Sequence, residues 1–189
     1  MNQPLKTVDF IHMEDGTKEE YVFLTEQEHV YNESLPDRLL DALSELEHSF
    51  GGYKVSRLEH SLQSATRAWE EGEDEEMVVA ALLHDIGDPL APHSHSEMAA
   101  AILRPYVSER IHWIIKHHGL FQAYYYAHHF DRDRNARDVH KDNPWYLDCV
   151  SFCANYDQNC FDPDFTSMPL EFFRPMVESV FAEPKNFDY

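Results

Sequence analysis

The segment EEMVVAALLHDI spans residues 75–86, and its run from Met77 to Leu83 is apolar on every side of a helix. A helix that is apolar all round is buried in the interior of a protein. Asp74 can cap the start of this helix, and Gly87 and Pro89 close its end. The segment therefore predicts a helix that is covered on all sides by the rest of the chain.

The pair His84-Asp85 lies at the end of this buried helix. An ionised carboxylate is costly there unless something compensates its charge, and a metal ion does so. The alternative is a polar pair that faces solvent at the helix end. The pair indicates a metal site if other helices supply further ligands.

Six further helices are expected from the spacing of apolar residues. They cover Leu39 to Leu46, Leu58 to Trp69, a segment from the capping-box pattern Ser94-x-x-Glu97 to Pro105, Ser108 to His118, a segment from Asn143-Pro144 to about Asp157, and Leu170 to Phe181. No segment has a clear set of alternating strands, so the predicted class is all-α, with residues 36–189 as one helical domain. Residues 1–35 are expected to form an arm, in which residues 7–11 and 21–24 are compatible with a short β-hairpin.

Composition limits the class of partner. The chain of 189 residues carries 15 Lys and Arg against 35 Asp and Glu, a formal charge of −20, which repels nucleic acid and anionic membranes. The longest apolar run, Met77 to Leu83, is too short to cross a bilayer, and the N-terminus has no export signal pattern. Reduced thiols are expected at Cys149, Cys153 and Cys160. We expect a cytoplasmic protein with no nucleic-acid or membrane partner; the oligomeric state stays open.

Two further polar residues fall on the predicted core-facing sides of helices. His118 completes an isoleucine stripe at helical spacing, and Asp157 shares a face with Cys149 and Cys153. A carboxylate in such a position needs a cation or several hydrogen-bond donors. The alternatives are a core histidine with satisfied hydrogen bonds and a surface aspartate beyond a frayed helix end.

His95 and His60 are weaker candidates. His95 follows Ser94 at a helix start, which favours the neutral imidazole that binds metal, and His93 competes with it. His60 lies opposite the apolar stripe of its own helix, so periodicity predicts exposure. A ligand role for His60 requires that the start of this helix be buried on both sides.

These positions give the order His60, His84-Asp85, His95, His118, Asp157. Such a set exceeds the needs of one tetrahedral zinc ion. It suits two ions of the iron or manganese type, because all donors are nitrogen or oxygen. Asp85 is the natural bridge, since a carboxylate has two oxygens to share.

The order His, His-Asp, Asp resembles the signature of the HD-domain superfamily over about residues 53–164, and the two additional histidines resemble its binuclear members. The motifs LEHSLQ at 58–63 and LHDIG at 83–87 are similar to those of its mixed-valent di-iron oxygenases. The motifs HHGLFQ at 117–122 and RNARD at 134–138, with Asp157-Gln158 and Phe161-Asp162-Pro163, are more similar still to the branch that acts on 1-hydroxy-2-(trimethylammonio)ethylphosphonate.

The resemblance implies a helical bundle that holds two iron ions as an Fe(II)/Fe(III) pair. The first iron would take His60, His84, Asp85 and Asp157, and the second would take Asp85, His95 and His118. The second iron would keep positions open for the substrate and O2. The implied reaction is the oxidative cleavage of the C–P bond of this organophosphonate to glycine betaine and phosphate.

The region before the first histidine departs from the family pattern. Phe50 and Tyr53 occupy the places of a tyrosine and a glutamate, which leaves Tyr31 or Tyr53 to lie beside the second iron. An aromatic residue in place of the glutamate suits a trimethylammonium group, because that cation has no N–H to donate and binds aromatic faces.

A second departure is Asp88, where family members often carry a His or Lys that contacts phosphoryl oxygens. An acid cannot do this at neutral pH. Arg134 and Arg137, assisted by Gln122, are therefore the candidates for binding the phosphonate. A solvated surface pair is the alternative for these arginines.

Two other functions fit the same residues. A metal-dependent HD phosphohydrolase acting on a nucleotide or phosphodiester would use the same six ligands to activate water. Asp88 and the acidic chain argue against it. A metal sensor without turnover is the third reading, and a site with no open coordination position would support it.

Overall fold

A computed structural model gives the fold and describes residues 7–186. That part of the chain contains helices, turns and loops but no strand, which confirms the all-α class. The α-helices are α1 Lys18–Asn32, α2 Leu35–Ser44, α3 Arg57–Glu70, α4 Glu75–Leu83, α5 His95–Leu103, α6 Glu109–Gln122, α7 Tyr146–Phe152 and α8 Leu170–Val180. Short 3-10 turns are η1 Met13–Asp15, η2 Glu45–His48, η3 Ala123–Tyr125, η4 Ala127–Phe130 and η5 Ala136–His140, and the π-helical turn η6 is Cys153–Asp157.

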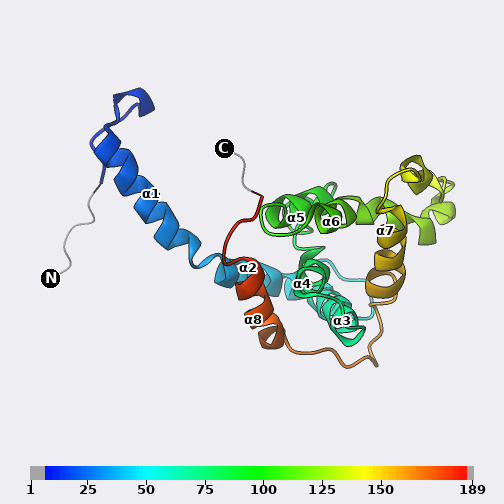
Figure 1. Cartoon of the computed structure of the whole chain (residues 1–189). Helices are drawn as coiled ribbons and strands as arrows, with labels where there is room; N and C mark the ends of the chain where they lie inside the picture. The colour runs from blue at the N-terminus through cyan, green and yellow to red at the C-terminus, as the bar shows by residue number, and fades with distance from the viewer. Residues whose placement is uncertain (1–6, 187–189) are drawn as a thin grey trace.

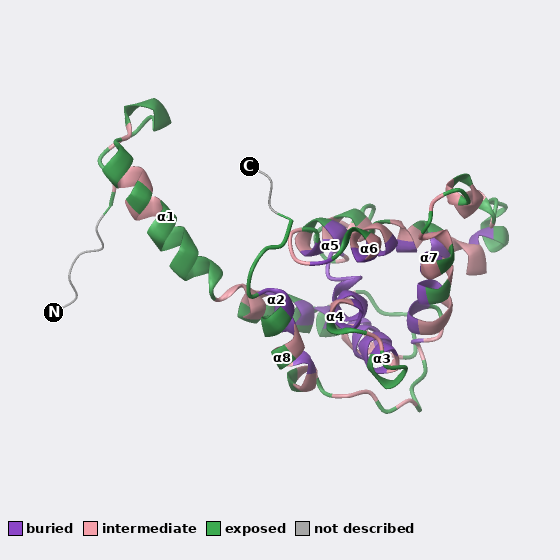
Figure 2. Cartoon of the chain, in the orientation of Figure 1, coloured by how far each residue is buried: buried purple, intermediate pink, exposed green. Residues whose placement is uncertain are grey.

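Helix α4 is the buried centre of the fold, as its sequence predicts. Every residue from Met77 to Leu83 is buried, and the Asp74 carboxylate accepts a hydrogen bond from the Met77 amide at 2.9 Å. Helices α3, α6 and α8 pack against α4 from different directions. Figure 2 shows the burial concentrated along α3 and α4. Because all sides of α4 are covered, the polar residues that follow it also lie in the interior.

The other helices form layers around this centre (Figure 1). Helix α5 packs along α6, and α7 continues into η6, which packs against α3. Helices α2 and α8 contact each other at the opposite end of the bundle, where α8 also contacts α4. No helix in residues 7–186 is both long and apolar enough to span a bilayer.

Most of the described part of the N-terminal arm is helical, so the expected β-hairpin is wrong. Residues 21–24 lie within α1, which projects from the bundle and has no buried residue (Figures 1 and 2). The cause is local: the Thr17 hydroxyl accepts a hydrogen bond from the Glu20 amide, and the Glu20 carboxylate accepts one from the Thr17 amide at 2.9 Å. This capping box starts a helix before the proposed second strand.

Several helix ends differ from expectation, and two of these differences concern α5 and α6. Helix α6 continues through Gly119 to Gln122. Helix α5 starts at His95 as expected, but the Ser94 side chain makes no capping hydrogen bond, so the predicted capping box does not form. Both differences occur where α5 and α6 approach each other closely, next to the polar cluster.

Candidate metal centre

The first turns of α3 are buried on both sides, and His60 is completely buried. Helix α4 covers one side, and η6 with the loop that follows it covers the other. The Gln63 side chain donates to the Asp162 carbonyl at 2.7 Å and accepts from the Asp162 amide at 3.2 Å. A distant segment therefore supplies hydrogen-bond partners for the polar face of α3. Periodicity predicted that His60 is exposed because it takes no account of such a segment.

Backbone carbonyls orient three histidine rings. The Nδ1 atoms of His60, His84 and His118 lie 3.0, 2.7 and 2.7 Å from the carbonyl oxygens of Cys160, Ala81 and Ile115. A carbonyl only accepts, so Nδ1 of each ring carries the proton. In a neutral ring this leaves a lone pair on Nε2, the arrangement that metal-binding histidines adopt.

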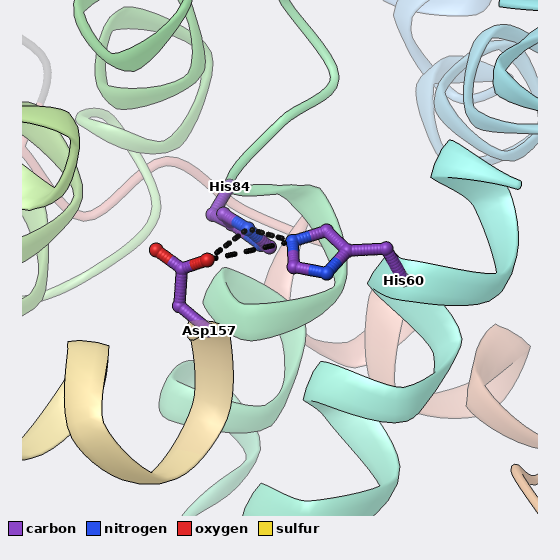
Figure 3. Close-up of side chains that lie close together, drawn as sticks. All are labelled: His60, His84 and Asp157. Atoms are coloured by element: carbon purple, nitrogen blue, oxygen red, sulfur yellow. Dashed lines mark hydrogen bonds and ion pairs between the residues drawn. The ribbon is translucent and has the colours of Figure 1, made fainter. Parts of the chain in front are cut away.

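The Nε2 atoms of His60 and His84 lie close to each other and to the carboxylate of Asp157 (Figure 3), and also to that of Asp85. They lie 3.5 and 3.9 Å from Asp157 Oδ1, and 3.3 and 3.1 Å from Asp85 Oδ2. The second oxygen of Asp157 is buried and has no hydrogen-bond partner. Two imidazole nitrogens and two carboxylate oxygens within such distances fit a bound cation.

A second group of donors lies on the other side of Asp85. Asp85 Oδ1 is 3.5 Å from His95 Nε2 and 3.5 Å from His118 Nε2. One oxygen of Asp85 therefore faces His60 and His84, and the other faces His95 and His118. This division is the geometry expected of a carboxylate between two metal ions, and the cluster has the composition of a binuclear site.

Two glycines bring α5 close enough to join the cluster. A Cβ at Gly87 would lie 2.8 Å from the His95 carbonyl oxygen and 2.9 Å from its Cα. A Cβ at Gly119 would lie 2.7 Å from the Ser96 hydroxyl. The turn after Asp85 and the residue after His118 thus both lack a side chain where the start of α5 packs.

The charges of the cluster favour a cation at its centre. Burial alone would lower the pKa of His84, but Asp85 and Asp157 outweigh it and raise that pKa to about 9. Burial would raise the pKa of Asp85, but His84 and Arg57 hold it well below its usual value. Burial lowers the pKa of His95, which keeps this ring neutral. Without metal, a proton on His84 supplies part of the positive charge that the carboxylates require.

A cavity of about 1080 Å³ opens onto the second group. Asp85, His95, His118 and Asp157 line it, whereas His60 and His84 do not. Gln122 also lines it and donates to Asp157 Oδ1 at 2.9 Å. His93, the competitor of His95, lines the cavity outside the donor groups. A ligand in the cavity would therefore meet the His95–His118 side of the cluster first.

The structure does not bring three of the predicted substrate residues to this cavity. Tyr31 lies on the projecting α1, with its ring 3.9 Å from the guanidinium carbon of Arg38. Arg134 and Arg137 pack on the ring of Tyr124, with their guanidinium carbons 4.1 and 3.9 Å from its centre. Among the described residues that line the cavity, these three do not appear. The expectation that Arg134 and Arg137 face the substrate therefore has no support in the geometry.

Tyr53 does line the cavity, with its ring stacked on Phe161 at 4.6 Å. The sequence reasoning missed Arg57, a buried residue that also lines the cavity. Its guanidinium donates from Nη2 to Asp85 Oδ2 and from Nε to Asp88 Oδ2, the latter at 2.9 Å. Its place three residues before His60, on the same face of a helix, was an available signal.

Residues 57–147 match the family model of the HD domain, a range that contains five of the six clustered residues and ends before Asp157. A segment of 84 residues is 33% identical to the 1-hydroxy-2-(trimethylamino)ethylphosphonate dioxygenase (glycine-betaine-forming) of Leisingera caerulea. The alignment covers 39% of this chain and 43% of that relative, less than half of its length. Residues 57–147 are thus similar to an HD domain, and they lie in an all-helical bundle around a buried histidine–aspartate cluster.

Proposed function

We propose that this protein is a di-iron oxygenase that cleaves the C–P bond of a 1-hydroxy-2-(trimethylammonio)ethylphosphonate-type substrate to glycine betaine and phosphate. The observation that carries the proposal is the division of the Asp85 oxygens between two histidine pairs. A bridging carboxylate of this kind is what a binuclear centre requires. The activity for which the Leisingera caerulea relative is named supports the choice of substrate class.

In this proposal the first ion is held by His60, His84, Asp157 and Asp85, and the second by Asp85, His95 and His118. All donors are nitrogen or oxygen, which suits iron or manganese rather than a thiolate-bound metal. We choose iron because the family resemblance implies an Fe(II)/Fe(III) pair, which can transfer electrons to O2. When bound, the iron pair supplies the electron transfer to O2 and the open coordination positions for the substrate.

The protein's own residues hold and shield this site. In this assignment the second ion would have three protein ligands against four for the first, and its histidines line the cavity from which substrate oxygens would approach. The Gln122 amide donates to Asp157 Oδ1 and fixes the orientation of that carboxylate. The carbonyls of Cys160, Ala81 and Ile115 keep the three buried rings in the ligand tautomer.

Aromatic side chains at the cavity support the trimethylammonium group as the substrate's cationic end. Tyr53, Tyr125, Tyr126, Phe130 and Phe161 line the cavity. A trimethylammonium has no N–H, so it gains from aromatic faces where a primary ammonium would gain from a carboxylate. Trp113 and Phe121 lie outside this set and pack against each other, with their ring centroids 5.9 Å apart.

The test is phosphate release from 1-hydroxy-2-(trimethylammonio)ethylphosphonate by iron-loaded protein, with and without O2. We expect release only with O2, together with an equal amount of glycine betaine. Asp85→Ala is the control variant and should release none. Phosphate release without O2, or hydrolysis of nucleotides by the same protein, would contradict the oxygenase and favour the phosphohydrolase.

A further inference from the structure

Arg57 is the first residue of α3 and lies at the boundary between the cluster and the cavity. Only 8% of its surface is exposed, although its guanidinium lines the cavity. Among the described residues that line the cavity, it is the only arginine or lysine. A chain with a formal charge of −20 repels anions, so an anionic ligand needs a local cation of this kind.

The hydrogen bonds of Arg57 leave part of its guanidinium available. Its Nε donates to Asp88 Oδ2 at 2.9 Å, and its Nη2 donates to Asp85 Oδ2. No hydrogen bond in the described part of the chain engages Nη1. The rings of Phe50, Tyr53 and Phe161 lie 5.7, 5.6 and 6.0 Å from its guanidinium carbon and restrict its movement. The group is thus held in place with N–H donors to spare.

Asp88 gains a role from this arrangement. The family resemblance leads one to expect a His or Lys at position 88, yet the carboxylate here holds a cation that comes from position 57. Asp88 Oδ1 also lies 3.6 Å from His95 Nδ1, so the same side chain faces a clustered histidine. The positive charge at this place comes from Arg57 on α3 rather than from position 88, and Asp88 is a positioning residue for Arg57.

We propose that Arg57, oriented by Asp88, binds the tetrahedral phosphonate group of the substrate where the cavity meets the cluster. The planar fork of an arginine matches two oxygens of such a group. Arg134 and Arg137 do not compete for this role, because neither lines the cavity. The phosphonate class rests on the proposed function, whereas the anion-binding role of Arg57 can be tested without any turnover.

The test is equilibrium binding of inorganic phosphate and of methylphosphonate to metal-loaded protein under anaerobic conditions, measured by titration calorimetry. Arg57→Gln is expected to weaken both by roughly tenfold or more, because a buried charged partner is lost. Arg134→Gln is the matched control and should bind both as the wild type does. Metal content and melting temperature are measured for each variant, so that a folding defect is recognised.

Two further variants keep the test decisive if Arg57→Gln loses metal. Arg57→Lys retains the charge without the fork and should bind phosphate with an intermediate affinity. The double variant Arg57→Gln with Asp88→Lys places the cation where the family carries it, and should recover most of the binding. Because binding is measured without turnover, recovery of phosphate affinity in this double variant would support the role of Arg57 even if the oxygenase proposal fails.

Several outcomes would overturn the proposal. They are wild-type affinity in both Arg57→Gln and Arg57→Lys, an equal loss in Arg134→Gln, and no measurable binding of either probe to the wild-type protein. If the wild-type protein binds phosphate through Arg57 but shows no oxygenase activity, the result would contradict the proposed reaction and leave the anion-binding role of Arg57 supported.

Discussion

The Nε2 atoms of His60 and His84 lie 3.0 Å apart at the centre of the bundle, although the two residues come from different helical segments. Each ring donates its Nδ1 proton to a backbone carbonyl, so two neutral rings would set lone pair against lone pair. A cation beside both nitrogens removes this conflict. The structure is therefore built around a positive charge that the chain supplies only in part.

Removing the metal should destabilise the protein. A ligand that binds only the folded state, present at about 100 times its dissociation constant, stabilises that state by roughly 2.7 kcal/mol. For a chain of this size, such a change corresponds to a fall in melting temperature of about 5–10 °C. We expect this fall when a chelator is added, measured by scanning calorimetry. Asp85→Ala, already without metal, should show no chelator effect; an unchanged wild-type melting temperature would contradict the metal centre.

Replacing Asp85 should remove both metals together. Its two oxygens face different histidine pairs, so Asp85→Ala deprives each group of one donor. Metal per chain, measured by atomic emission after loading and desalting, is expected to fall from two to near zero. Asp41→Ala, on the exposed face of α2, is the control and should keep both metals. Retention of two metals by Asp85→Ala would show that this carboxylate does not bridge.

A methyl group at Gly87 should affect the second metal position more than the first. The added Cβ would meet the backbone of His95 at 2.8–2.9 Å, and backbone cannot move aside as a flexible side chain can. We expect Gly87→Ala to lose the ion next to the cavity and to keep the one at His60 and His84. Gly51→Ala, with no atom within 4 Å of the added Cβ, is the matched control. Equal metal content in the two variants would count against a close approach of α5.

Tyr53 allows a test of the proposed trimethylammonium pocket. Tyr53→Ala should weaken binding of the trimethylammonium substrate more than binding of its primary-amine analogue, by roughly 0.5–2 kcal/mol. Binding can be measured anaerobically by competition with phosphate. Tyr31→Ala is the control, because Tyr31 is 62% exposed on α1 and lies outside the cavity. An equal loss for both ligands would make Tyr53 a packing residue, consistent with its stacking on Phe161.

The sequence predicted those features that depend on local pattern. The buried α4 followed from its uniform apolar character and its Asp74 cap, and the inward side of His118 followed from helical spacing. His60 could not be placed in this way, because a segment about 100 residues later covers its side of α3. The partners of Arg57 could not be predicted from local pattern either, because Asp88 and Asp85 lie 31 and 28 residues away, although its place on the His60 face of α3 was a signal. The error in the arm arose because two short apolar runs resemble strands, while the capping box of Thr17 and Glu20 favours a helix.

The hydrogen bond between His60 Nδ1 and the Cys160 carbonyl joins positions 100 residues apart, and Asp157 lies in the turn just before Cys160. One short segment thus supplies a candidate ligand and also holds a second one in its tautomer. The donor set is therefore complete only where η6 is docked on α3. A displacement of this one segment would remove the Asp157 carboxylate and the carbonyl that orients His60 at the same time. The candidate cation site thus depends on a contact between distant parts of the chain and not on α3 and α4 alone.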